Sequence, residues 1–311
     1  MRVTTADHAP GSETIRETAP RPLLAAGALR AALAPGQGGR VAGFWRETDG
    51  QADPILMPMA EAAFDPLFWP KAGCYPLAPF SNRIRDGRFR FGGRDVQLPA
   101  HPACPPHALH GFSQLRAWSC ALENASAAVM TYAHEPDAWP WRFTATQTVR
   151  LSETALAIAI AIRNEDATPI PVGLGLHPYL VARHGDRVRF NAGIEWSQDE
   201  AGCGIAPQRL SGSEAAHDLR HGAAGMTRYF ADWDGRVLID RADGRRISIK
   251  SDGVLDQLVM HAPEGGAYLC VEPVSHVADA FNLAARGVQG AGTRVAGPGE
   301  TVRGSMTIAL E

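Results

Sequence analysis

The sequence has no marked excess of charge of either sign. Its 311 residues include 30 lysines and arginines against 33 aspartates and glutamates, a formal net charge of −3. Proteins that bind nucleic acid usually present a strongly basic surface to the phosphate backbone, and this balance does not supply one. Hydrophobic residues make up 45% and charged residues 20%, which is typical of a globular chain. A small or neutral ligand fits the composition better than a polyanion, and we expect no nucleic-acid partner.

Cysteines are few, odd in number and without a C-x-x-C pair. A disulfide framework normally uses an even number of cysteines, and a zinc ribbon uses closely spaced pairs. Neither is indicated, so we expect a reducing compartment, the cytoplasm. The five cysteines are Cys74, Cys104, Cys120, Cys203 and Cys270.

The chain also lacks a hydrophobic run long enough to span a bilayer. Its most apolar stretch, residues 23–35, is short and is interrupted by Arg30, whereas a transmembrane helix needs about 20 apolar residues. The stretch is weak as a signal peptide because acidic residues precede it. We interpret it as an opening pair of strands, at 23–33 and 40–45, with a turn at Gly36–Gly39. No membrane partner is expected.

Long stretches of helical periodicity are absent too, and short apolar alternation recurs instead. The clearest strand is predicted at Ala155–Arg163, where every second residue is Leu or Ile. Strands at 236–240 and 246–250 flank a Gly-containing link, which predicts a hairpin. This spacing favours an all-β sandwich or barrel. Further strand and turn signals lie at 88–98, 119–131, 143–151, 257–260 and 302–310.

Nothing between residues 21 and 311 resembles a linker or an internal repeat, so a single β domain is predicted there. Residues 1–20 mix Thr, Glu, Pro and Ala without periodicity, as poorly ordered termini do. We leave them out of the fold prediction.

Several catalytic motifs are missing. No Gly-x-Ser-x-Gly elbow is present, and Gly173-Leu174-Gly175 lacks the third glycine of a dinucleotide loop. His107 and His110 are three residues apart, and with Glu272 they form an alternative metal set. Their loop is rich in proline rather than helical, so the two rings need not share a face, and we predict no metal.

Four polar clusters remain, each beside glycine or proline, where the chain turns and side chains can converge. His177 precedes Pro178 at the end of an apolar run, and Glu272 follows the apolar residues 268–271. A carboxylate in such a run needs a partner or a function, so a buried salt bridge is the alternative to catalysis. Together the clusters suit binding of a polyhydroxylated ligand and transfer of protons. They span residues 79–84, 107–112, 173–179 and 270–276.

In this order and spacing, the clusters resemble the aldose 1-epimerase (galactose mutarotase) family over most of the chain. Asn82-Arg83-Ile84 looks like the family's N-R-I segment, and His110-Gly111-Phe112 looks like its H-G segment. His177-Pro178-Tyr179 looks like its H-P-Y segment. Residues 271–276 and 279–282 are similar to the C-terminal signature of the bacterial branch.

The resemblance implies a large antiparallel β-sandwich, the galactose mutarotase-like supersandwich, which binds a sugar in an open cleft without a cofactor. It places the general base on Glu272 and the general acid on His177. The substrate-binding residues fall on Arg83 and His110, with Asn82 in the same segment. Such an enzyme takes the proton from the anomeric hydroxyl and gives one to the ring oxygen, with base and acid facing opposite sides of the ring. A partly buried glutamate suits this work because burial raises its pKa toward neutrality.

One position departs from the family. Ahead of Phe230 the family carries an aspartate that accepts hydrogen bonds from sugar hydroxyls, and Thr227 stands in its place. The alternative is that Asp232 takes over the role of the missing aspartate. Two other functions stay open: a hexose-6-phosphate 1-epimerase using Arg85, Arg116 or Arg228, and a sugar-binding or regulatory module without turnover. The oligomeric state is not predicted.

Overall fold

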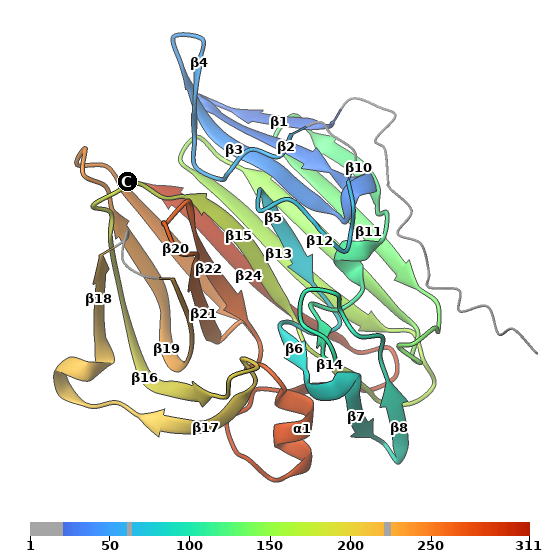
Figure 1. The fold of residues 1–311 in the computed structure, drawn as a ribbon. Coiled ribbons are helices and arrows are strands. Elements are labelled where there is room, and N and C mark those ends of the chain that lie inside the picture. Colours follow the sequence, from blue (N-terminus) through green and yellow to red (C-terminus); the bar gives the residue numbers. More distant parts are fainter. Residues whose placement is uncertain (1–20, 61–63, 221–224) are drawn as a thin grey trace, which may run out of the picture.

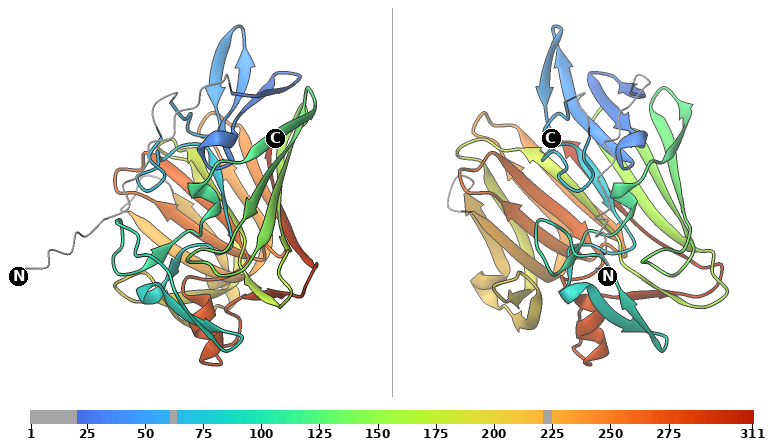
Figure 2. Two further views of the ribbon diagram at one scale, coloured as in Figure 1. Left: turned by 90° about the vertical axis from the view of Figure 1, so that its right-hand side faces the viewer. Right: turned by 45° about the vertical axis from the view of Figure 1, so that its right-hand side comes forward.

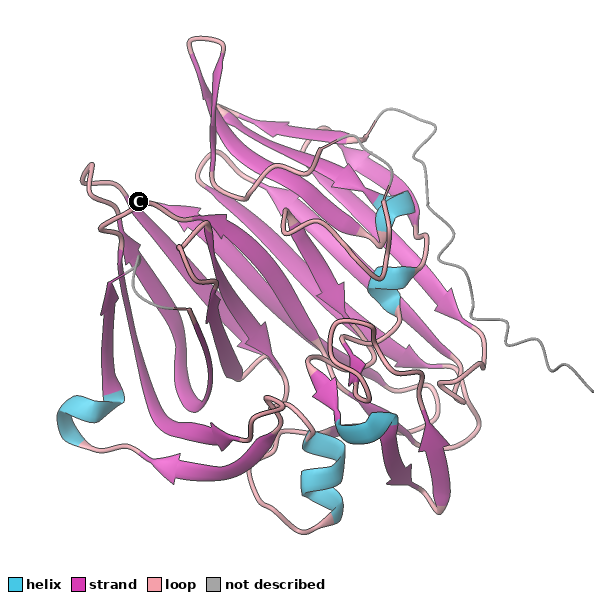
Figure 3. Ribbon diagram, in the orientation of Figure 1, coloured by secondary structure: helices cyan, strands magenta, loops and turns pink. Residues whose placement is uncertain are grey.

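The computed structural model describes residues 21–60, 64–220 and 225–311. The predicted disorder of residues 1–20 falls outside these ranges. Antiparallel strands dominate the described part of the chain and helices are few and short, as Figure 3 shows. The all-β prediction is confirmed.

The strands form two layers that face each other, which we call the first and second walls. The first wall begins with the hairpins β10–β11 and β12–β13 and continues from β13 to the C-terminal strand β24 (Figure 1). The last strand pairs with β20, which pairs with the second half of the long strand β19. β19 also pairs with β16. The strands of this wall are β10 (Ser119–Asn124), β11 (Ala127–His134), β12 (Phe143–Leu151), β13 (Ala155–Asn164), β24 (Thr301–Leu310), β20 (Arg246–Gly253), β19 (Met226–Asp240), β16 (Arg187–Gln198), β17 (Gly204–Arg209) and β18 (Ala216–Arg220).

The first half of β19 continues into the second wall, so the two walls belong to one hydrogen-bonded sheet. At the far edge of this wall, β1 and β2 pack against β12, which brings the walls face to face; Figure 2 shows the layers from two further sides. The strands are β21 (Gln257–Ala262), β22 (Tyr268–Val274), β15 (Gly175–Val181), β5 (Cys74–Leu77), β3 (Arg40–Thr48), β2 (Leu29–Ala34), β1 (Leu23–Ala26) and β4 (Gln51–Pro54).

Small elements gather at one end of the sandwich (Figure 1). The small elements are the strand pairs β6 (Arg83–Ile84) with β9 (Ala108–Leu109), β7 (Arg88–Phe91) with β8 (Arg94–Gln97), and β14 (Ile170–Val172) with β23 (Arg294–Ala296), and the helix α1 (Ala280–Ala285). No helix in the described ranges has both the length and the apolar character that a membrane crossing requires. Single 3₁₀ turns lie at η1 (Pro35–Gln37), η2 (Arg85–Gly87), η3 (Ser113–Leu115) and η4 (Gly212–Ala215).

The predicted strands agree closely with the observed ones. The strand at 143–151 is matched in full, and the predicted hairpin forms from β19 and β20. The segments at 23–33, 88–98 and 119–131 each fold as a hairpin. Turn chemistry explains these breaks, because Gly27, Gly92 and Gly93 have positive φ and Asn124 Oδ1 accepts the Ser126 N–H at 2.8 Å.

Apolar side chains, at every second position along the strands, fill the space between the walls. Leu156, Ile158, Ile160 and Ile162 are fully buried on one face of β13. A second apolar cluster, separate from this core, lines the opposite face of the second wall and includes Tyr75, Tyr179 and Cys270. That face carries His177 of β15 and Glu272 of β22, whereas Asn82, Arg83 and His110 lie on or beside the separate pair of β6 and β9.

Candidate active site

His177 and Glu272 lie opposite each other on the neighbouring strands β15 and β22. The register pairs Gly175 with Val274 and Tyr179 with Cys270, and His177 and Glu272 fall between these pairs on one face because strand side chains alternate. His177 Nε2 is 3.3 Å from Glu272 Oε1. The two groups stand side by side on the sheet, and their predicted placement on opposite sides of a sugar ring stays a prediction.

Aromatic rings surround the imidazole of His177. Tyr75 lies opposite His177 on β5 and stacks on it with ring centroids 4.7 Å apart, and Tyr179 stacks at the same distance. The Trp69 indole donates a hydrogen bond of 3.0 Å to the Tyr179 hydroxyl. The ring packing leaves the side chains of His177 and Glu272 only 7% and 4% exposed, so the pair lies in an environment of low polarity.

Burial moves the two pKa values in opposite directions. It raises the pKa of Glu272 to about 8, because a carboxylate loses its hydration there. It lowers the pKa of His177 well below the usual value, and the positive charge that His110 would carry adds to this effect. Near neutral pH the pair therefore holds a single proton.

His110 meets the pair edge-on, with its ring centroid 5.3 Å from that of His177. Its Nδ1 accepts the backbone N–H of Asn82 at 3.1 Å, so the neutral ring carries its hydrogen on Nε2. Burial, followed by the Arg83 charge, lowers the pKa of His110 well below its usual value. The sequence-predicted His110 is thus a neutral hydrogen-bond donor beside the acid–base pair.

Arg83 and Asn82 form one unit with His110. Asn82 Oδ1 accepts the Arg83 backbone N–H at 2.9 Å and the Arg83 Nη1 at 3.3 Å. Arg83 Nε is buried and has no hydrogen-bond partner within the described ranges. A Cβ at Gly202 would lie 2.9 Å from Arg83 Nη1, so this glycine makes room for the guanidinium. Asn82 thereby fixes the positions of both Arg83 and His110.

Sequence reasoning missed His261, which lies beside Thr227. The two residues are opposite each other on β21 and β19, and Thr227 Oγ1 lies 2.9 Å from His261 Nδ1. His261 also lies opposite Cys270, so it shares the face of the acid–base pair. Asp232, the alternative substitute for the family aspartate, lies against Gly193 of β16 instead. Thr227, at the position where the resemblance predicts an aspartate, therefore forms a pair with His261.

The two histidines of the H-x-x-H spacing serve different purposes. His107 Nδ1 accepts the backbone N–H of Asp86 at 3.0 Å, whereas His110 faces the acid–base pair. Each ring is oriented by a backbone N–H, and the residues do not converge on a shared ligand position with Glu272.

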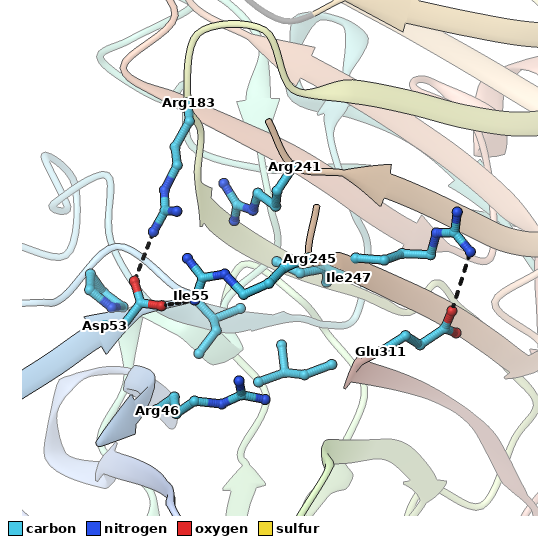
Figure 4. Close-up of a pocket in the computed structure, with 11 residues that line it drawn as sticks. Arg46, Asp53, Ile55, Arg183, Arg241, Arg245, Ile247 and Glu311 are labelled. Atoms are coloured by element: carbon cyan, nitrogen blue, oxygen red, sulfur yellow. Dashed lines mark hydrogen bonds and ion pairs between the residues drawn. The ribbon is translucent and has the colours of Figure 1, made fainter. Parts of the chain in front are cut away.

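An arginine-rich pocket lies elsewhere on the molecule and contains none of the predicted site residues (Figure 4). Asp53 of β4 accepts hydrogen bonds from Arg183 at 2.7 Å and from Arg245. Arg241 pairs with Asp186 at 2.7 Å. The Asp53 ion pairs tie the hairpin of β3 and β4 to the segments that follow β15 and β19, and the pair of Arg241 with Asp186 joins those two segments to each other.

Comparison with known proteins gives a consistent result. The family model described as aldose 1-epimerase matches residues 23–309. The Escherichia coli K12 protein YphB is 28% identical over 295 residues, which cover 88% of this chain and 93% of YphB. A galactose mutarotase-like protein from Clostridium acetobutylicum has a TM-score of 0.80 at 21% identity, with 93% of this chain and 94% of that chain covered. A galactose 1-epimerase from Lactobacillus acidophilus has a TM-score of 0.69 at 12% identity, with 91% of each chain covered.

Proposed function

The chain belongs to the aldose 1-epimerase family, and from this we propose that it interconverts the α and β anomers of a free sugar by acid–base chemistry between Glu272 and His177. The observation that carries the proposal is the contact of 3.3 Å between the two side chains on one sheet face. We further propose that the enzyme needs no cofactor and works in the cytoplasm.

The shared proton explains how the pair would work. The raised pKa of Glu272 and the lowered pKa of His177 put the shared proton on Glu272 at rest, and it first moves to His177 across the contact of 3.3 Å. Ionised Glu272 then takes the proton of the anomeric hydroxyl while protonated His177 gives its proton to the ring oxygen, and the bond between C1 and the ring oxygen breaks. Rotation about C1–C2 presents the other face of the aldehyde. Ring closure runs the transfers in reverse and gives the other anomer. The pair holds one proton throughout, and both sugar oxygens are bonded to C1, so an adjacent acid and base can reach them.

Arg83 and His110 would hold the sugar during this exchange. The Nε2–H of His110 is a hydrogen-bond donor beside the pair, and the Arg83 guanidinium is a second donor close to His110. Donors placed where negative charge develops stabilise the transition state. Asn82 acts as a positioning residue, because its backbone N–H and its side-chain oxygen orient both groups.

The arginines that a phosphorylated substrate would need are already paired. Arg85 contacts Asp199 at 2.5 Å, and Arg116 contacts Asp137 at 3.2 Å. Arg228 binds both oxygens of Glu195 at 2.7 Å. Because each cation has a carboxylate partner, this arrangement favours an unphosphorylated sugar over a hexose 6-phosphate.

The direct test is anomer exchange on freshly dissolved sugars. We expect the protein to accelerate exchange of at least one of glucose, galactose, xylose and arabinose above the buffer rate, measured by polarimetry or NMR exchange. Glucose 6-phosphate serves as the charged comparison and should exchange more slowly than the best free sugar. If the sugars bind without faster exchange, the protein is a binding module. Preferred turnover of the phosphate would contradict the assignment to free sugars.

The activity is expected to fall on the alkaline side of about pH 8. Turnover needs one proton on the pair, and with a pKa of about 8 at Glu272 that proton is lost as the pH rises through this value. On the acidic side the lowered pKa of His177 delays the second protonation, so activity should persist below pH 6.5. The measurement is kcat/KM against pH in chelator-treated protein, after subtraction of the buffer rate. A rise in kcat/KM through pH 8 would contradict the shared-proton mechanism.

A further inference from the structure

A third side chain adjoins the acid–base pair. Cys270 lies two residues before Glu272 on β22, so both side chains share one face of the strand. One ligand atom each from His177, Cys270 and Glu272 lies within 4.8 Å of the other two, and all three residues are buried. In the described ranges this is the group of histidine, cysteine and acidic residues that comes close enough to hold a metal ion.

The donor set is the one that zinc prefers. Imidazole nitrogen, thiolate sulfur and carboxylate oxygen bind zinc at roughly 2.0–2.3 Å, and tetrahedral sites with three protein ligands leave the fourth position to water. Those bond lengths place neighbouring ligand atoms roughly 3.3–3.6 Å apart. The distance of 3.3 Å from His177 Nε2 to Glu272 Oε1 already fits. Coordination by Cys270 needs its sulfur to move in from within 4.8 Å, and the thiol releases its proton to solvent as the metal–thiolate bond forms.

We propose that His177, Cys270 and Glu272 form an inhibitory site for Zn²⁺ or a similar thiophilic divalent cation. The metal would occupy the acid and the base at once, so it would compete with the sugar. Binding follows from the three side chains alone, whereas inhibition also rests on the proposed epimerase function. The site would thus make the activity sensitive to the free zinc concentration.

Two positive charges near the cluster keep this binding weak. The Lys71 ammonium lies 4.3 Å over the Trp69 ring, and the Arg40 guanidinium lies 4.3 Å over the Tyr75 ring, which stacks on His177. Both charges repel a cation at the pair. A zinc ion held there should therefore leave readily to a chelator, unlike a structural zinc that supports the fold.

The binding experiment is a titration of chelator-treated full-length protein with Cd²⁺, followed by the ultraviolet charge-transfer absorption of a cadmium–thiolate bond. We expect one equivalent to give the absorption. Cys270→Ser and Cys270→Ala should lose it, and the matched control Cys104→Ser should keep it. Circular dichroism of each variant checks that it is folded. The same absorption in the folded Cys270 variants would overturn the site.

The activity experiment adds Zn²⁺ to the exchange assay and compares each protein with its own metal-free rate. Zn²⁺ should inhibit the unsubstituted enzyme competitively with sugar, and a chelator should restore the rate. Half-inhibition of Cys270→Ser should need at least about tenfold more Zn²⁺, since one of three ligands is lost. Equal sensitivity of the two proteins would overturn the inhibitory site. A cadmium–thiolate signal in a protein without exchange activity would refute the epimerase function and leave the metal site standing.

Discussion

Replacing Glu272 by glutamine is expected to lower catalysed anomer exchange by roughly 10²–10⁴-fold, the usual contribution of a positioned acid or base. Glutamine keeps the shape of the side chain and removes its capacity to take a proton. In the proposed mechanism Arg83 and His110 hold the sugar, so the carboxyl is not needed for binding. Sugar binding, measured by calorimetry, should therefore remain detectable while polarimetry reports only the buffer rate.

A matched control is Glu195→Gln, which removes a carboxylate from the same sheet. Glu195 pairs with Arg228 on β16 and β19 and takes no part in the proposed reaction. Its substitution should leave exchange within a few-fold of the starting rate. If Glu272→Gln keeps full activity, Glu272 is not the base and the mechanism must be rebuilt around another residue.

The same substitution is expected to make the protein more stable, and more so at high pH. The pKa of Glu272 is about 8 in the folded protein against 4.5 for an ordinary solvated glutamate, so the folded state binds its proton more tightly than the unfolded chain does. The free energy of unfolding therefore falls as the pH rises from about 4.5 to about 8, and then levels off. The full difference has a ceiling of about 5 kcal/mol. Glutamine does not ionise, so the variant does not lose this free energy of unfolding as the pH rises.

Urea unfolding of both proteins at pH 5 and pH 9 checks this expectation. The advantage of Glu272→Gln should be a few kcal/mol at pH 9 and small at pH 5. An advantage of equal size at the two pH values would show that the carboxyl is not held in the protonated form. A gain in stability together with a loss of turnover is the trade-off expected where a buried group is kept for its chemistry.

The sequence alone predicted the strands well because turn chemistry is local. Gly-containing links and strict alternation define β13, β20 and the last five residues of β19, 236–240, from neighbouring residues only. The same alternation indicates that Cys270 shares a face with Glu272, and Tyr179 with His177. These neighbours of the site could be found from spacing of two residues along a strand.

The register between strands could not be predicted from the sequence. Whether His177 lies opposite Glu272 or one position away depends on how β15 pairs with β22, and that pairing depends on contacts across the whole sheet. For the same reason His261 passed unnoticed, since it reaches Thr227 only through the pairing of β21 with β19. Trp69 lies 110 residues before Tyr179 in sequence, and only the tertiary fold brings its indole to that hydroxyl.

The register of β15, β22 and β21 limits how such a chain can change in length. Inserting or deleting one residue between Gly175 and His177 would turn the imidazole to the opposite face and point a neighbouring side chain at Glu272. The turn at 242–244 between β19 and β20 carries no such constraint, because its residues pair with no site strand. Over evolutionary time the strands of the site can accept new side chains but not new lengths, whereas the hairpin tips can accept both.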